Sequence, residues 1–103
     1  DTWHWWTAND RVEDLLTLKN EDIVTVDLND APAGLEKRDQ QDNARELPAA
    51  TGVIDVANFV KALIQIGYDG PIRPEPFNKP LNELENDAAC AATIAAMKKA
   101  TAI

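Results

Sequence analysis

Glu75 is the residue whose setting in this sequence most strongly indicates chemistry. It lies in the stretch GYDGPIRPEPF (67–77), directly between two prolines. Pro76 pushes Glu75 out of the helical region toward extended geometry, and Pro74 has a locked φ angle and no backbone donor. A solvated surface charge needs no such stiffness. We therefore interpret Glu75 either as the polar end of a strand or as a carboxylate held in a fixed pose for a ligand.

Two short segments are predicted to be strands, and Glu75 ends the second of them. The first is DIVTVDL (22–28), and the second is PIRPE (71–75). A period of two separates an apolar face of the first strand from a face that turns polar, namely Val24, Val26 and Leu28 from Ile23, Thr25 and Asp27. In the second strand, Ile72 and Pro74 share one face while Arg73 and Glu75 share the other.

Helices are predicted before, between and after these strands. The apolar spacing from Asp10 to Leu18 indicates a short helix with Asp10 as its N-cap. A second stripe predicts a helix from Asp55 to Ile66, ended by Gly67. An alanine-rich stretch predicts a final helix from Leu81 to Ala100. The segment 29–51 is polar and lacks periodicity, so we expect a loop that is either functional or disordered.

The alternation of helices and strands predicts an α/β fold with parallel strands and helical crossovers. A doubly wound sheet usually carries a glycine-rich turn for phosphate, and the turn after Asp27 is NDAPAG, without that motif. A (β/α)₈ barrel is therefore favoured. In a barrel, Thr25 and Asp27 converge with Arg73 and Glu75 at the mouth, where such folds carry their catalytic groups.

Composition excludes several classes of protein. The 103 residues, 45% of them hydrophobic, suffice for one globular unit but not for a large domain, so residues 1–103 are expected to form a single unit. A net charge of −8 argues against a nucleic-acid partner, and no apolar run approaches the ~20 residues of a membrane span. Cys90 is the only cysteine, which favours a reducing, cytoplasmic setting. The chain lacks a starting Met, so we expect it to begin partway through a longer polypeptide.

Four motifs together resemble the C-terminal part of the xylose isomerase-like TIM barrels. They are DTWHWW, VDLNDAP, RELPAATGVID and GYDGPIRPEPF, and they cover nearly the whole chain in the family's order. This superfamily comprises sugar phosphate isomerases and epimerases and also includes endonuclease IV-type enzymes. The resemblance implies that residues 1–103 are a single partial domain, part of a barrel, since a full barrel needs about 250 residues. It also implies a divalent metal that polarises the substrate's oxygens while two glutamates move a proton between adjacent carbons.

The resemblance assigns roles to four residues. Asp1 matches the family's aspartate metal ligand after the sixth strand, and Glu75 matches the ligand and acid/base glutamate after the eighth. His4 matches a histidine that contacts the substrate, although it could also belong to an aromatic cluster with its tryptophan neighbours. Arg45 matches an arginine that grips the substrate's oxygens or phosphate, although an arginine in so charged a loop is ordinarily solvated.

Two departures from the family pattern bear on the metal. Asp27 stands where the seventh strand of many relatives has a histidine ligand. As a ligand with Asp1 and Glu75, it makes the site all-oxygen, which favours Mg²⁺ or Mn²⁺ over Zn²⁺. Alternatively the site has lost its metal. The fourth ligand, a glutamate from an earlier strand, is not in this chain.

These expectations combine into one function and one alternative. The chain is expected to be the C-terminal part of a metal-dependent sugar or sugar-phosphate isomerase or epimerase, inactive without the preceding part of the barrel, with a homo-oligomer as a possible assembly. The alternative is a non-catalytic sugar-binding barrel domain that has lost turnover. The endonuclease branch is disfavoured by the net charge of −8 and the single histidine. Asn29 and Asp30 either orient substrate or form the turn after the first strand.

Overall fold

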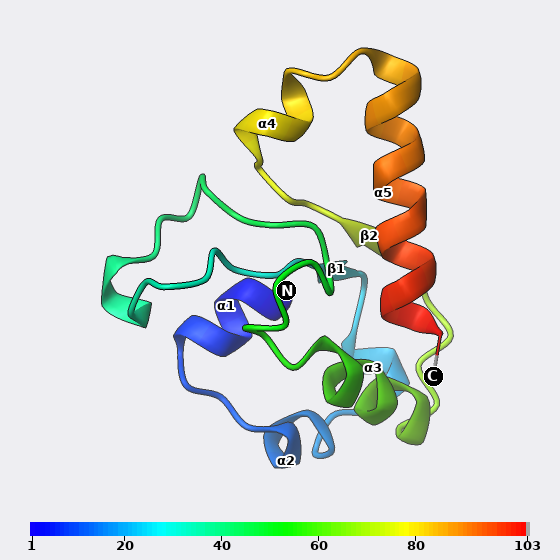
Figure 1. Ribbon diagram of the computed structural model, residues 1–103. Helices are drawn as coiled ribbons and strands as arrows, with labels where there is room; N and C mark the ends of the chain where they lie inside the picture. Colours follow the sequence, from blue (N-terminus) through cyan, green and yellow to red (C-terminus); the bar gives the residue numbers. More distant parts are fainter. Residues whose placement is uncertain (103) are drawn as a thin grey trace.

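The computed structural model describes residues 1–102 and places two short parallel strands at its centre, β1 (Val26–Leu28) and β2 (Ile72–Pro74). Asp27 pairs with Arg73, and the register continues on either side of this pair. Between the strands the chain passes through α3 (Val56–Gln65), because parallel strands cannot be joined by a tight turn. Figure 1 shows α3 below the strands and α5 (Asn86–Thr101) running alongside β2. The predicted parallel strands with a helical crossover are confirmed.

Both strands are shorter than predicted. β1 begins at Val26, whose backbone N–H donates to the carbonyl of Pro71, and the preceding residues have no partner strand. A 3₁₀ turn, η1 (Asn20–Asp22), occupies the start of the predicted strand, and Val24 is 89% exposed. The expectation that Val24 shares the buried face of Val26 and Leu28 is therefore wrong, because a strand forms only where a neighbour supplies its hydrogen bonds.

The helix from Asp55 is confirmed by its caps. The side chain of Asp55 accepts a hydrogen bond from Asn58 N at 3.1 Å, and Gly67 follows the helix at a φ angle of +76°. This left-handed conformation suits glycine, which has no Cβ to clash with the backbone. The buried side of α3 contributes Val56, Phe59, Val60, Ala62 and Leu63 to the core, which also contains Leu28, Ile54 and Trp3.

The other helices differ from the prediction. Helix α1 (Thr2–Thr7) was not predicted, and α2 (Val12–Leu15) has Arg11 rather than Asp10 as its N-cap. The final helix is divided into α4 (Lys79–Asn82) and α5. The division arises because the Glu85 carboxylate accepts hydrogen bonds from Asp87 N and Ala88 N and so starts a new helix. Within residues 1–102, no helix is both long and apolar enough to cross a membrane.

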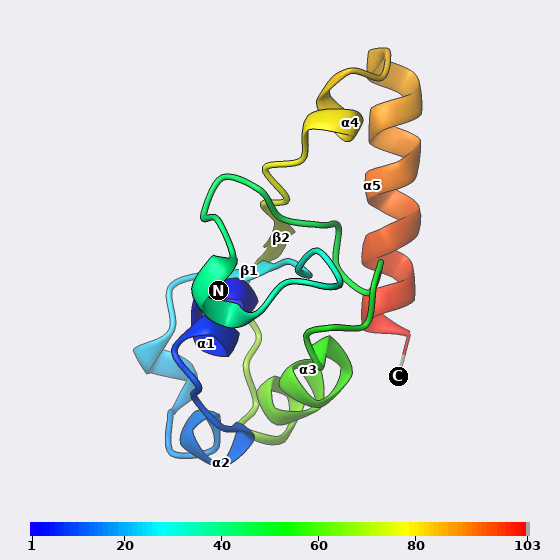
Figure 2. The same ribbon diagram turned by 60° about the vertical axis from the view of Figure 1, so that its left-hand side comes forward.

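The long segment 29–51 is held in place by contacts of Asp30, near its start, with residues near its end. Apart from a 3₁₀ turn, η2 (Lys37–Asp39), it contains no described helix. Asp30 and Glu46 form an antiparallel bridge, with two backbone hydrogen bonds of 2.9 Å. The fully buried Asp30 carboxylate accepts further hydrogen bonds of 2.8 to 3.0 Å, from the backbone N–H groups of Ala31, Thr51, Gly52 and Ile54. Figure 2, in which this segment comes forward, shows it folded over α1 and the strands.

Candidate metal centre

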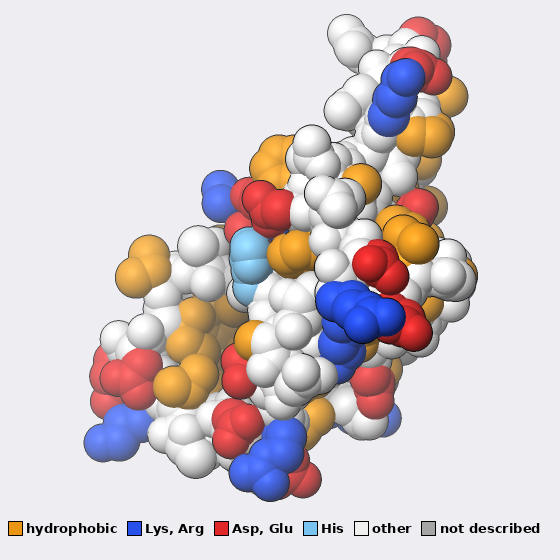
Figure 3. All heavy atoms as spheres, turned by 90° about the vertical axis from the view of Figure 1, so that its left-hand side faces the viewer, with side chains coloured by type: hydrophobic (Ala, Val, Ile, Leu, Met, Phe, Trp, Pro, Cys, Tyr) orange, Lys and Arg blue, Asp and Glu red, His pale blue; other side chains and the backbone are white. Residues whose placement is uncertain are grey.

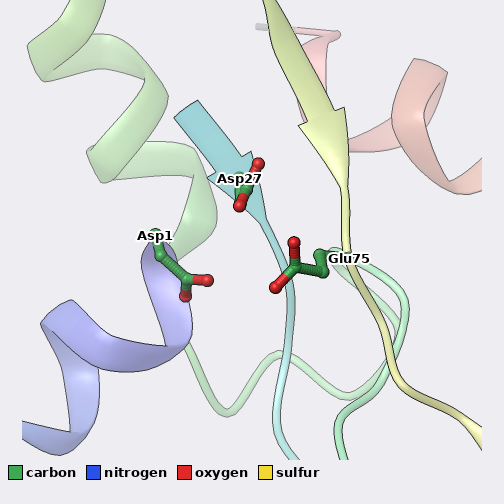
Figure 4. Close-up of side chains that lie close together, drawn as sticks. All are labelled: Asp1, Asp27 and Glu75. Carbon is green, nitrogen blue, oxygen red and sulfur yellow. The ribbon is translucent and has the colours of Figure 1, made fainter. Parts of the chain in front are cut away.

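Three carboxylates from separate elements point into one space. Asp1 precedes α1, Asp27 lies on β1 and Glu75 directly follows β2, as Figure 4 shows. One oxygen from each lies within 4.8 Å of the others, and all three residues are half-buried. The expected closeness of these three carboxylates is present in the structure.

Local sequence explains each placement. Asp1 is the N-cap of α1, where its Oδ1 accepts hydrogen bonds from Trp3 N at 2.8 Å and His4 N at 3.1 Å. Asp27 faces Arg73 across the parallel pair. Glu75 is held extended by Pro76, and its backbone N–H donates to Asn29 Oδ1 at 3.1 Å.

Asn29 joins the elements that bear these carboxylates, a role that the sequence interpretation left open. It is fully buried, and its Nδ2 lies 3.5 Å from each carboxylate oxygen of Asp1. Its backbone N–H donates to Thr2 Oγ1 at 2.7 Å, and that hydroxyl donates to the Asn29 carbonyl at 2.8 Å. Its position directly after a strand was the signal in the sequence, since polar residues at carboxyl ends of parallel strands face the site.

Arg73 and Arg45 neutralise part of this acidic cluster. Arg73 Nε donates to Asp27 Oδ1 at 2.6 Å, and its Nη2 lies 3.6 Å from Glu75 Oε2. The hydrogen bond from Arg73 lowers the pKa of Asp27 below its usual value, and the charge of Arg73 acts in the same direction. Arg45 Nη1 donates to Asp1 Oδ2 at 2.9 Å and lies 3.6 Å from Glu75 Oε1.

The donor set fits a hard divalent cation. Two oxygens on opposite sides of one cation, with bonds of about 2.0–2.6 Å, lie about 4–5 Å apart, which accommodates the spacing of Asp1, Asp27 and Glu75. With Asp42, which also pairs with Arg45, four carboxylates face two guanidinium groups among the described residues. The carboxylates thus outnumber the guanidinium groups, and a divalent cation would reduce the remaining repulsion.

The two predicted substrate contacts lie beside this cluster but differ in exposure. His4 is exposed, its Nε2 lies 3.3 Å from Arg45 Nη2, and its ring stands edge-on to Trp3 at a centroid distance of 5.0 Å. It therefore belongs to the aromatic cluster and still reaches the surface. Arg45, in contrast, has a side chain only 1% exposed, so it is not the solvated loop arginine that its charged neighbours suggested.

Charged side chains of both signs are mixed on one face of the described residues. On the face that Figure 3 shows, Lys and Arg side chains are scattered among Asp and Glu side chains. Phosphate backbones are bound by clustered basic groups, and the absence of a nucleic-acid partner stays a prediction.

Comparisons with known proteins give a family and two solved structures. A family model described as xylose isomerase-like TIM barrel matches residues 1–100. A xylose isomerase domain protein from Alicyclobacillus acidocaldarius subsp. acidocaldarius is 30% identical, with a TM-score of 0.79 over 99% of this chain and 36% of that chain. The IolI protein, solved with a bound zinc atom, is 20% identical, with a TM-score of 0.88 over 98% of this chain and 36% of that chain. This chain thus spans 36% of the length of both. No curated protein matches it significantly.

Proposed function

The chain belongs to the xylose isomerase-like TIM barrel family, and from this premise we propose that it is the C-terminal part of a metal-dependent sugar or sugar-phosphate isomerase or epimerase. The fold is accordingly the expected α/β partial (β/α)₈ barrel. One observation carries the proposal: the carboxylates of Asp1, Asp27 and Glu75 converge where parallel strands end. Barrel enzymes have their active sites at that end of the strands.

Asp1, Asp27 and Glu75 would hold the metal. Their oxygens favour Mg²⁺ or Mn²⁺, whereas zinc sites in proteins are usually built from nitrogen and sulfur ligands. The zinc atom reported for IolI belongs to that protein, whose likeness to this chain is one of fold. When bound, the cation supplies polarisation of the carbonyl and hydroxyl oxygens of the substrate.

Glu75 is the proposed acid/base group. Its carboxylate would accept a proton from the carbon beside the substrate carbonyl. Glu75 would then return a proton to the adjacent carbon, or the family's second glutamate, from an earlier strand, would deliver one to the opposite face of the same carbon. The first outcome is isomerisation and the second is epimerisation, and neither consumes an oxidant or reductant. Asn29 fixes the backbone of Glu75, which keeps the carboxylate where the strand ends. His4, exposed at the rim, is the proposed substrate contact.

A second candidate function is a sugar-binding barrel domain without turnover. The observation that favours it is the 2.6 Å hydrogen bond from Arg73 to Asp27. The positive charge of Arg73 already neutralises Asp27, which stands where many relatives carry a histidine ligand. In such a domain, Arg45 and Arg73 would balance the acidic cluster without a metal.

Hydrogen exchange separates the two candidates. A full-length protein containing this chain is incubated in D₂O with Mn²⁺ and a panel of ketoses, aldoses and their phosphates, and carbon-bound deuterium is followed by NMR. The enzyme proposal expects deuterium next to the carbonyl of at least one sugar, and Glu75→Gln should slow that exchange about 10²–10⁴-fold. Glu83→Gln, a control at an exposed glutamate 4.0 Å from Lys79, should leave it unchanged. Sugar binding without exchange would support the second candidate, and normal exchange in Glu75→Gln would contradict the role of Glu75.

A further inference from the structure

Arg45 is a charged side chain that the protein encloses on every side. Nε donates to the Asp42 carbonyl at 2.8 Å, Nη1 donates to Asp1 Oδ2 at 2.9 Å, and Nη2 donates to Asp42 Oδ1. The guanidinium carbon lies 4.9 Å from the ring centroid of Trp3 and 5.0 Å from that of Phe77. Both the edge and the faces of this planar group are therefore occupied by protein atoms.

Such burial leaves no exposed donor for a substrate. The Arg45 side chain is 1% exposed although only residues 1–102 cover it, and any further chain packed against the site can only reduce that exposure. Arg73, from the same acidic cluster, has a side chain 60% exposed. The contrast indicates that Arg45 interacts with the site through the carboxylates rather than through a ligand.

The backbone that presents Arg45 is also fixed. The next residue, Glu46, is bonded in both directions to Asp30. Arg45 N donates to the Phe77 carbonyl at 3.2 Å, and Asn78 Nδ2 donates to the Arg45 carbonyl at 3.0 Å. Phe77 itself has a φ angle of +37°, in a region that side-chain-bearing residues rarely adopt, so the chain after Glu75 is turned onto Arg45.

We propose that Arg45 is a positioning residue, which sets the carboxylates of Asp1 and Glu75 at the spacing that a shared cation requires, and that it does not bind the substrate. Of the proposed function, this proposal needs only the cation that Asp1, Asp27 and Glu75 would hold. Its geometry is the rigid fork of the guanidinium, with Nη1 2.9 Å from Asp1 and 3.6 Å from Glu75. Lysine carries the same charge but cannot hold Asp1 and Asp42 at once in a fixed plane.

The test is Arg45→Lys in the full-length protein, with Mn²⁺ alone as the probe. Groups that orient metal ligands typically contribute a factor of about 10 to 100 in metal affinity, and we expect a loss of that size in calorimetric titration of substrate-free protein. With the sugar on which the wild type exchanges hydrogen, kcat should fall while KM changes little. Arg38→Lys is the matched control, because Arg38 lies in the same loop, is 82% exposed and pairs only with Glu36 among the described residues. A raised KM with unchanged Mn²⁺ affinity would assign Arg45 to the substrate and overturn the proposal.

Two further measurements test the role of Arg45 if the first experiment fails. If Arg45→Lys does not fold, Asp42→Ala removes a partner of Arg45 that contacts neither Asp1 nor Glu75, and Asp39→Ala controls for the change in charge. The proposal expects a loss of Mn²⁺ affinity in Asp42→Ala beyond that in Asp39→Ala, and equal affinities overturn it. If the wild type binds no Mn²⁺, the proposed function fails, but the role of Arg45 can still be tested. A crystal structure of Arg45→Lys, or of Asp42→Ala if Arg45→Lys does not fold, then decides that role. Displaced carboxylates of Asp1 and Glu75 support positioning, and unmoved ones overturn it.

Discussion

The carboxylate of Asp30 accepts four hydrogen bonds from backbone N–H groups on both sides of the segment 29–51. A buried carboxylate is costly unless its oxygens are satisfied, and here they are satisfied by the chain itself. Of the two roles that the sequence left open for Asp30, the structure thus supports the structural one. Its neighbour Asn29 contacts the predicted ligands Asp1 and Glu75 instead. The two adjacent polar residues therefore differ in role, since Asp30 stabilises the loop and Asn29 supports the site.

Asp30→Asn should destabilise the full-length protein by at least about 2 kcal/mol. The amide has one acceptor oxygen, and its two N–H groups would face backbone N–H groups that need an acceptor. Urea unfolding measures the change. Asp39→Asn, at an exposed position of the same loop, should shift the free energy of unfolding by less than about 0.5 kcal/mol, and equal effects would contradict this account.

Asp27 predicts a pH dependence with a defined sign. Its pKa is lowered in the folded protein, chiefly by the hydrogen bond from Arg73, so its ionised form stabilises the fold. That contribution is fully present above the unfolded value of about 3.9 and is lost as the pH falls through the lowered folded pKa. In metal-free protein, the destabilisation caused by Asp27→Asn should therefore be constant from pH 5 to about 7 and shrink below about pH 4. Unfolding curves that show the same difference at pH 3 and pH 7 would contradict it.

At the level of helices and strands, the sequence was informative where a periodic pattern met a cap. Helix α3 could be predicted because its apolar stripe is bounded by Asp55 and Gly67. Helix α1 could not, because six residues rich in aromatic side chains show no period. The break before α5 depends on the Glu85 carboxylate, which the alanine-rich composition conceals.

A comparison of two aspartates tests this reading of the caps. Asp55→Ala removes the oxygen that Asn58 N uses and should cost about 1 kcal/mol of unfolding free energy. Asp10→Ala, at the residue that the sequence predicted as a cap, should be nearly neutral, because Arg11 occupies that position and is supported by Asp14. Thermal unfolding of both variants measures the difference, and equal losses would restore the original interpretation of Asp10.

The closeness of Asp1, Asp27 and Glu75 could be predicted because parallel strands bring their carboxyl ends together, while Asp1 depended on the resemblance. Their roles as ligands stay predictions. The burial of Arg45 could not be foreseen, since it depends on Trp3, Phe77 and the 29–51 loop meeting in three dimensions. Distant contacts of this kind leave no periodic trace in a single sequence.

The described residues leave an apolar surface exposed beside β2 and α5. Among the described residues, β2 pairs only with β1. Beyond β2, adjoining cavities of about 490 and 370 Å³ lie against α5, and Ile94 lines both while remaining 54% exposed. Unpaired strand edges and apolar grooves of this size promote association.

The isolated 103-residue chain should therefore self-associate and bind a hydrophobic dye. Sedimentation velocity should show oligomers whose fraction falls in Ile94→Lys. Ile64→Lys, at an exposed residue of α3 that lines neither groove, is the matched control and should change association less. A monodisperse wild-type monomer that melts cooperatively would show that residues 1–103 form a self-sufficient unit.

The bridge between Asp30 and Glu46 has a consequence for how this protein can diversify. Because both ends of the intervening chain are tied together, we expect the stretch 33–39 to change in length without moving Arg45, which adjoins the bridge, as long as Lys37 keeps its contacts with Asn9 and Trp6. Lengthening such a closed excursion is inexpensive, since doubling a flexible loop costs only about 0.6 kcal/mol. The length of this stretch can therefore vary while the backbone that presents Arg45 stays fixed. Segments transplanted from relatives into this stretch should leave the carboxylates of Asp1 and Glu75 in register.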